Sequence, residues 1–237
     1  MPPTLWVYKL VHDSGAAPHV MDGLLSLAIC KPMIRNRAEV GDWIFGFGGR
    51  SRPVIRGERF IYAARVTGKL ARPGEYYDRP EFRRRWDCVY ERRNGRLLSR
   101  PGAVFHPDNT CSGRDVGEGP TYAKAIVLLS NKFRYLGARG TTDYLDRWPD
   151  LGTFVHELGI GQRQVEAESR TGRMLMEMQQ RLWKTCDFVG EPTEPSEPPP
   201  WSSGPDGDDD DPIDPTRPNR SGASGCPPSP PPKPRRC

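Results

Sequence analysis

Short apolar runs bounded by turn residues set the pattern of the first two thirds of the chain. Four runs have the length and the β-branched or aromatic content of strands, at residues 5–11, 40–47, 59–67 and 125–129. The run at 125–129 is apolar throughout, which predicts a central strand buried on both faces. Residues 133–136 alternate and predict a second strand in a hairpin with it.

Helical spacing is clearest at the end of this region. From Arg173 onward Leu175, Met178, Leu182 and Cys186 recur every three or four residues, with charged and amide residues between them. Such spacing places the apolar side chains on one face of a helix. We expect an amphipathic helix here that packs on the sheet and closes the domain.

The remaining segments give weaker signals. Residues 24–30 fit either a strand or a short helix, and we favour a strand ended by Pro32. Residues 78–86 and 143–148 each predict a short helix, and the Gly-, Arg- and Pro-rich residues 91–121 predict long loops.

Several strands before one main helix, without regular alternation, indicate an α+β fold. We expect a bent antiparallel or mixed sheet with short capping helices and one C-terminal amphipathic helix. The block Gly41 to Phe45, followed by a long loop and a returning strand, is also similar to the PUA-like barrels, including the EVE group. That weaker resemblance implies a possible partial barrel.

Composition changes sharply near Gly190. Residues 190–237 contain 15 of the 26 prolines and an acidic run at 208–211. Such a segment buries too little apolar surface to offset the entropy lost on ordering. We predict two parts, an α+β domain at 1–189 and a disordered, acidic, Pro-rich tail at 190–237 that could recruit protein partners.

The charge also divides at this point. The tail has 5 basic and 9 acidic residues, which leaves 30 basic and 21 acidic residues in the domain. A basic, arginine-rich domain attracts polyanions, although a GC-rich genome gives the same composition. The loop at 48–58 carries three of these arginines and is a candidate for phosphate contact.

Other classes of protein are disfavoured. No signal peptide pattern precedes the first strand and no apolar run approaches the roughly 20 residues that cross a bilayer, so we expect a cytoplasmic protein that does not contact membrane. The cysteines lack CxxC spacing and the histidines lack HxH or HExxH spacing. GxGxxG, Walker A and GxSxG patterns are also absent, and we expect no metal and no cofactor.

Several blocks together resemble the second of the nucleotide-modification-associated domain families of bacteria and phages, over about residues 5–165. The matching blocks are residues 8–18, 30–35, 40–46, 114–115, 127–137 and 159–163. Two departures matter: Gln162 stands where the family pattern has histidine, and residues 87–90 replace a Gly-Asp-Asn-Ile-Tyr-like block. The resemblance implies a role in nucleotide modification.

Aromatic and basic side chains in or beside these blocks fit a pocket for an extruded base, with rings to stack on it and cations to hold its phosphates. The expected nucleotide-binding residues are Lys31, Arg35, Asp42, Trp43, Tyr62, Phe133, Tyr135 and Arg163. Core packing is the alternative for Trp43 and Tyr62, a turn for Asp42, and a surface position for Lys31. Catalytic residues stay unassigned, although Asp13, Asp42 and Asp115 could converge in space.

The leading interpretation is therefore a domain that binds modified DNA or a modified nucleotide in DNA modification or phage defence. The alternative is an enzyme that makes or removes a nucleobase modification. A third interpretation is an interaction protein that recruits partners through its Pro-rich tail.

Overall fold

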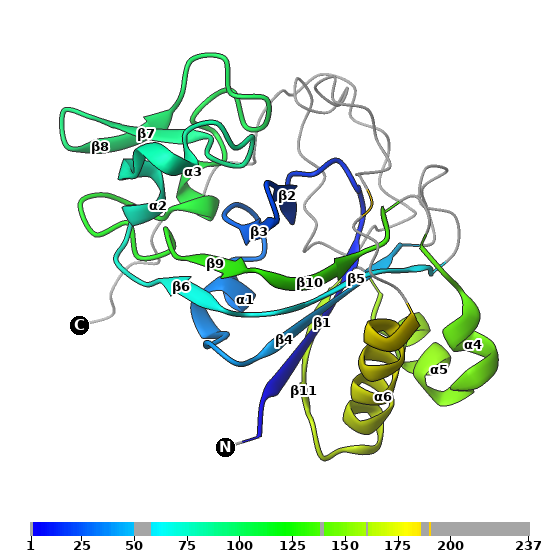
Figure 1. Cartoon of the computed structure of the whole chain (residues 1–237). Helices are drawn as coiled ribbons and strands as arrows, with labels where there is room; N and C mark the ends of the chain where they lie inside the picture. Colours follow the sequence, from blue (N-terminus) through cyan, green and yellow to red (C-terminus); the bar gives the residue numbers. More distant parts are fainter. Residues whose placement is uncertain (1, 50–57, 138–139, 160, 186–189, 191–237) are drawn as a thin grey trace, which may run out of the picture.

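The computed structural model describes residues 2–49, 58–137, 140–159, 161–185 and 190. The arginine-bearing part of the loop at 50–57 and nearly all of the predicted tail lie outside the described residues. Within the described part, two larger β-sheets and a small hairpin combine with short helices in an α+β arrangement (Figure 1). The predicted fold class is confirmed.

The larger sheet has the strand order β10-β5-β4-β1-β11. Its strands are β10 (Lys132–Tyr135), β5 (Phe60–Arg65), β4 (Trp43–Gly48), β1 (Thr4–Leu10) and β11 (Gln162–Glu166). β1 and β4 run parallel, and the other neighbours run antiparallel. The sheet is therefore mixed, and its central strands are buried on both faces, which explains why they are almost continuously apolar.

The second sheet has the order β2-β3-β9-β6. It contains β2 (His19–Met21), β3 (Leu24–Leu27), β9 (Val127–Ser130) and β6 (Gly68–Leu70). The chain passes from one sheet to the other twice over very short links, from β5 to β6 and from β9 to β10. The sheets are thus strongly bent around a shared core, but the described strands do not close into a barrel.

The hydrophobic core has three parts. Leu25, Leu27 and Leu128 of the second sheet pack with Tyr8 and Ile44 of the larger one. The opposite face of the larger sheet is covered by α4 (Asp143–Arg147), α5 (Pro149–Glu157) and α6 (Arg170–Thr185), as Figure 1 shows. The predicted amphipathic helix is confirmed in α6.

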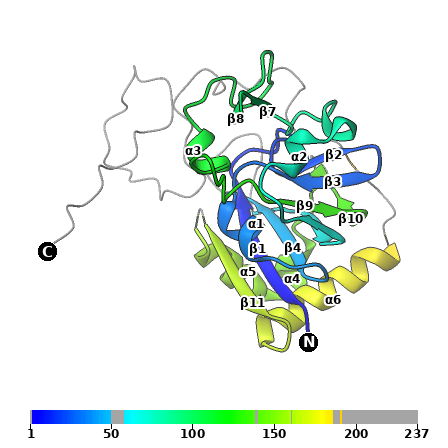
Figure 2. The ribbon, with the colours of Figure 1, turned by 90° about the vertical axis from the view of Figure 1, so that its left-hand side faces the viewer.

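The third part of the core lies on the far side of the second sheet. It is built around α2 (Glu75–Asp78), the 3₁₀ turn η1 (Pro80–Phe82) and the hairpin of β7 (Tyr90–Arg93) and β8 (Arg96–Ser99). Both views place this layer and α3 (Ser112–Asp115) at the opposite end of the molecule from α4, α5 and α6 (Figure 2).

Three details differ from the sequence predictions. Residues 91–121 contain the β7–β8 hairpin, whose Asn94-Gly95 turn has positive φ at both residues, as a type I′ turn requires. Pro32 does not simply end a strand, because it is the first residue of α1 (Pro32–Arg37). β10 pairs with β5, so the predicted β9–β10 hairpin is wrong.

No helix among the described residues is both long and apolar enough to cross a membrane.

Candidate active site

The site begins at an unusual stretch of backbone between β3 and α1. Cys30 has φ 55° and Lys31 has φ 42°, two consecutive left-handed residues without a glycine. Such residues cost about 1–3 kcal/mol each and persist only where the surroundings hold them. The same conformation recurs at His106, with φ 47°, in the loop between β8 and α3.

Both backbone polar groups of Cys30 are held by charged side chains. The Cys30 N–H donates to Oδ1 of Asp115 at 2.9 Å, and Nε of Arg35 donates to the Cys30 carbonyl at 2.7 Å. Asp115 is 3% exposed and Arg35 is fully buried. The left-handed turn is therefore fixed from both sides, at a cysteine that is partly exposed and not part of a disulfide.

The Arg35 side chain points into the protein, where it hydrogen-bonds to the backbone of this region. Its guanidinium also donates to the backbone carbonyls of Lys124 at 2.7 Å, Ile126 at 2.8 Å and Asp115 at 2.7 Å. Four hydrogen bonds to carbonyls occupy the planar donor fork. The sequence interpretation placed Arg35 at a phosphate, whereas its observed contacts tie α1 to the Asp115 backbone and to the chain before β9.

His106 contacts the same carboxylate as the Cys30 backbone. Its Nδ1 is 2.5 Å from Oδ2 of Asp115, and the nearby Cys30 side chain is one of the causes that raise the pKa of His106. The Tyr90 hydroxyl donates to the same Asp115 oxygen at 2.8 Å. The Asp115 carboxylate thus hydrogen-bonds to the Cys30 amide, the His106 ring and the Tyr90 hydroxyl, and these three contacts fix its orientation.

The electrostatics of the pair favour charge separation. Burial opposes a positive His106, but the Asp115 charge and the hydrogen bonds to Asp115 and Cys30 outweigh it, so its pKa lies well above the usual value. Burial also opposes a negative Asp115 and so raises its pKa. The contacts with His106, and then those with Arg35 and the Cys30 amide, outweigh burial and lower this pKa to about 2. At neutral pH the carboxylate is ionised and the imidazole is protonated.

A protonated imidazole beside a thiol stabilises the thiolate, which is the nucleophilic form of cysteine. A nucleophile, an acid–base group in hydrogen-bond contact with it, and a third group that orients the base form the arrangement used in covalent catalysis. Asp115 orients the His106 ring and also holds the Cys30 backbone, so these three residues resemble that arrangement. Among the described residues no group of three or more His, Cys, Asp or Glu side chains is arranged to hold a metal ion.

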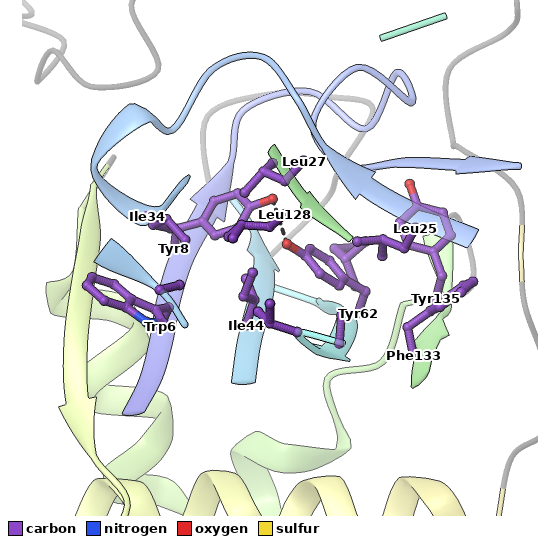
Figure 3. Close-up of a cluster of buried hydrophobic side chains, with 14 of the residues drawn as sticks. Trp6, Tyr8, Leu25, Leu27, Ile34, Ile44, Tyr62, Leu128, Phe133 and Tyr135 are labelled. Carbon is purple, nitrogen blue, oxygen red and sulfur yellow. Dashed lines mark hydrogen bonds between the residues drawn. The ribbon is translucent and has the colours of Figure 1, made fainter. Parts of the chain in front are cut away.

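A chain of phenols lies next to this site. The Lys31 ammonium is 5.2 Å from the centre of the Tyr8 ring, and the Tyr62 hydroxyl donates to the Tyr8 hydroxyl at 2.9 Å (Figure 3). Tyr135 donates to the buried carboxylate of Asp13. Burial raises the pKa of Tyr62 far above its usual value, more than its bond to Tyr8 lowers it, so this phenol is neutral.

The structure separates the predicted nucleotide-binding residues. Tyr62, Phe133 and Tyr135 lie in the core between the two sheets, on the same side as Tyr8. Trp43 faces the opposite side of the larger sheet, where its ring is 5.2 Å from that of Trp183 in α6. Rings on opposite faces of a sheet do not stack on one base.

The two remaining predicted residues lie outside this core. Asp42 accepts the backbone N–H groups of Thr4 and Glu39, both at 2.9 Å, and the Trp6 indole N–H at 3.3 Å, which matches the turn alternative. Arg163 is exposed on β11, with its guanidinium 5.6 Å from the Phe154 ring.

Sequence reasoning did not assemble the triad. Cys30 and Asp115 lie 85 positions apart, and His106 falls in a segment that predicted only loops. The available signal was that Cys30 and Asp115 both stand in blocks matching the family pattern, while His106 precedes Asp115 by nine positions.

The fold and the site together define an α+β domain with a braced thiol, imidazole and carboxylate. The chain belongs to the nucleotide modification associated domain 2 family, whose model matches residues 2–144. Cys30, His106 and Asp115 all lie inside the match, and Arg163 lies outside it. No curated protein and no solved structure matches the chain, and the weaker similarity to PUA-like domains is not shown.

Proposed function

We propose that this chain is an enzyme of nucleotide modification that uses the Cys30 thiolate as its nucleophile. The observation that carries the proposal is that one buried carboxylate, Asp115, holds both the Cys30 backbone and the His106 ring. His106 would move the proton and Asp115 would hold the imidazole in position. Nucleic acid or a nucleotide is the substrate class that the family context supports.

The geometry favours this alternative over a domain that only binds modified bases. A stacking pocket needs rings with exposed faces, whereas Tyr62 and Tyr135 are fully buried and Trp43 lies on the other face of the sheet. A binding protein also has no need for a partly exposed thiol at a strained residue beside a charged imidazole.

Lys31 is the predicted nucleotide-binding residue that adjoins the nucleophile in the chain. Its side chain is 2% exposed and lies over the Tyr8 ring. A buried ammonium makes the surrounding potential positive, which favours an anion such as a thiolate or a phosphate. We keep Lys31 in the proposal as the residue that attracts the charged substrate.

The test is conversion of nucleosides by the full chain. Duplexes, unmodified or carrying modified cytosine or thymine, and the matching nucleotides are incubated with protein, and nucleosides are measured by mass spectrometry. Cys30→Ser and His106→Gln should each reduce conversion by about a thousand-fold or more, as for residues that act as a catalytic unit. Cys88→Ala is the matched control, because this cysteine is buried and its backbone carbonyl, which accepts from Arg100, is kept in the variant.

Salt-resistant preference for one modified base, without conversion of any nucleoside by the wild-type chain, would support the binding interpretation instead. Conversion that survives Cys30→Ser would show that the catalytic group lies elsewhere.

A further inference from the structure

The segment between η1 and β7 places two arginines and a tryptophan at the surface. Arg83, Arg84 and Trp86 are exposed, whereas Arg85 and Asp87 in the same segment are buried. Trp86 is 36% exposed, although so large a ring is usually well covered. An exposed aromatic ring beside positive charges is the combination that surfaces for single-stranded nucleic acid use.

The two buried residues hold this segment rigidly on the second sheet. Nη2 of Arg85 donates to the backbone carbonyls of His19 at 3.2 Å and Leu24 at 3.0 Å. Oδ2 of Asp87 accepts the Ser26 hydroxyl at 2.5 Å. The exposed ring lies between these two anchors in the sequence, so its backbone is fixed before any ligand arrives. Such preorganisation reduces the entropy that is lost on binding.

The Trp86 ring is supported by the imidazole of His19. The two ring centres are 5.9 Å apart and the planes are tilted by 32°. Nδ1 of His19 lies 2.9 Å from the Gly15 carbonyl, which can only accept, so Nδ1 carries the proton. Burial lowers the pKa of His19 more than the Asp87 charge raises it. The imidazole is therefore neutral, and it holds the indole in place while part of the indole stays exposed.

The charges around this ring favour an anion. Residues 72–100 contain nine arginines and five acidic residues. Each of the five carboxylates forms an ion pair with an arginine of the same range: Glu75, Asp78, Glu81, Asp87 and Glu91. Within the part of the chain that the structure describes, neither Arg83 nor Arg84 is paired with a carboxylate. Their guanidinium groups can therefore bind phosphates through a planar fork of donors.

We propose that this surface binds single-stranded nucleic acid, with an unpaired base stacked on Trp86 and neighbouring phosphates held by Arg83 and Arg84. A base inside a duplex is covered on both faces by its neighbours, so a protein ring stacks on an unpaired base. The inference goes beyond the proposed function, because it assigns a binding surface in which Cys30 has no part.

Fluorescence anisotropy measures binding of the full chain to a labelled single-stranded DNA, to the same strand made abasic, and to its duplex. Trp86→Ala should weaken binding to the single strand by about ten-fold or more, as the loss of a stacking ring does. Binding to the abasic strand should stay unchanged, because that strand has no base to stack. Leu145→Ala is the matched control, since Leu145 is 38% exposed on α4. An RNA strand of the same sequence is measured in parallel, and a loss with either strand supports the inference.

The salt dependence tests the arginines. Each phosphate contact to a single strand contributes about 0.7 to the slope of log K against log salt, so replacing Arg83 and Arg84 together by alanine should reduce this slope by about 1.4. Replacing Arg181 and Lys184 together is the matched control. Both are exposed on α6, which lies at the opposite end of the molecule (Figure 2), and the slope should stay nearly unchanged.

Equal losses of affinity for the normal and the abasic strand in Trp86→Ala, with folding verified by thermal melting, would overturn the inference. Tighter binding of the duplex that is insensitive to Trp86→Ala would overturn it as well. Cys30→Ser should bind the single strand as the wild-type chain does. A failure of this surface is therefore seen in binding, whereas a failure of the proposed function is seen in nucleoside conversion.

Discussion

At the scale of single residues, the Asp115 carboxylate determines the surroundings of both Cys30 and His106. Asp115 accepts hydrogen bonds from the Cys30 amide and the Tyr90 hydroxyl and contacts the His106 ring, so it fixes the Cys30 backbone and raises the pKa of His106. A left-handed cysteine is unfavourable in isolation, and Asp115 together with Arg35 supplies the hydrogen bonds that stabilise it. The same contacts therefore explain how the strained backbone persists, and they underlie the reactivity that we propose for Cys30.

Replacement of Asp115 by Asn should change the pH dependence of Cys30 alkylation by iodoacetamide. Asp115 raises the pKa of His106, so its loss lets that pKa fall and the imidazole loses its proton near neutral pH. The thiolate is then less stabilised, and alkylation at about pH 6 should fall roughly ten-fold. Above about pH 9 an ordinary thiol ionises without help, so the two rates should converge. The rate is measured on the Cys30 peptide, and an equal loss at every pH would indicate a structural role only.

Part of this site could be predicted from the sequence. Cys30, Lys31 and Arg35 stand in one matching block, and the sequence predicts phosphate contacts for Lys31 and Arg35. The observed contacts of Arg35 depend instead on burial and on partners distant in the chain, such as the Asp115 backbone. Periodicity shows which residues are apolar but not which distant polar groups meet. The sequence therefore could not predict that His106 and Cys30 share a contact with Asp115.

At the scale of elements, α1 holds the Cys30 backbone through a single side chain, Arg35. Arg35→Lys should lower the free energy of unfolding by about 3 kcal/mol, because a lysine cannot reproduce four hydrogen bonds from a planar fork and leaves buried carbonyls unpaired. Arg37→Lys is the matched control, since Arg37 lies exposed on the same helix. Urea denaturation measures both variants. Equal, small losses would show that the carbonyls find other partners.

The elements also show why strand positions were easier to predict than their pairing. β1, β4, β5 and β9 follow from apolar content, but the short Ser130–Lys132 link reads as a hairpin turn whereas the chain bends there into another sheet. The β7–β8 hairpin was missed because β7 is mostly charged and both strands are short, although Asn94-Gly95 is a strong turn signal. In contrast, β11 was missed because its partner β1 lies at the other end of the domain.

At the scale of the whole molecule, the bend between the sheets is what allows α1, α3 and the β8–α3 loop to meet. Gly46 marks how tightly this bend is packed, because a Cβ atom there would lie 2.2 Å from the Tyr62 ring. Tyr62 and Tyr8 thus pack the larger sheet against the second one. The chain continues from β3 of the second sheet into α1 after a short link. The site is a product of the two-sheet arrangement rather than of any one motif.

The same arrangement predicts where the folded unit ends. The sequence places the boundary after residue 189, and the structure shows the Gly190 N–H donating to the Tyr135 carbonyl of β10 at 2.5 Å. A chain ended after Gly190 keeps this bond, and it also keeps every described element. With reductant present, we expect its melting temperature to lie within about 3 °C of that of the full chain, since a Pro-rich acidic segment contributes little buried apolar surface. Differential scanning calorimetry compares the two chains, and a drop of about 10 °C would mean that the tail packs on the domain. Unchanged stability with reduced nucleoside conversion would instead assign the tail to the capture of substrate or partner.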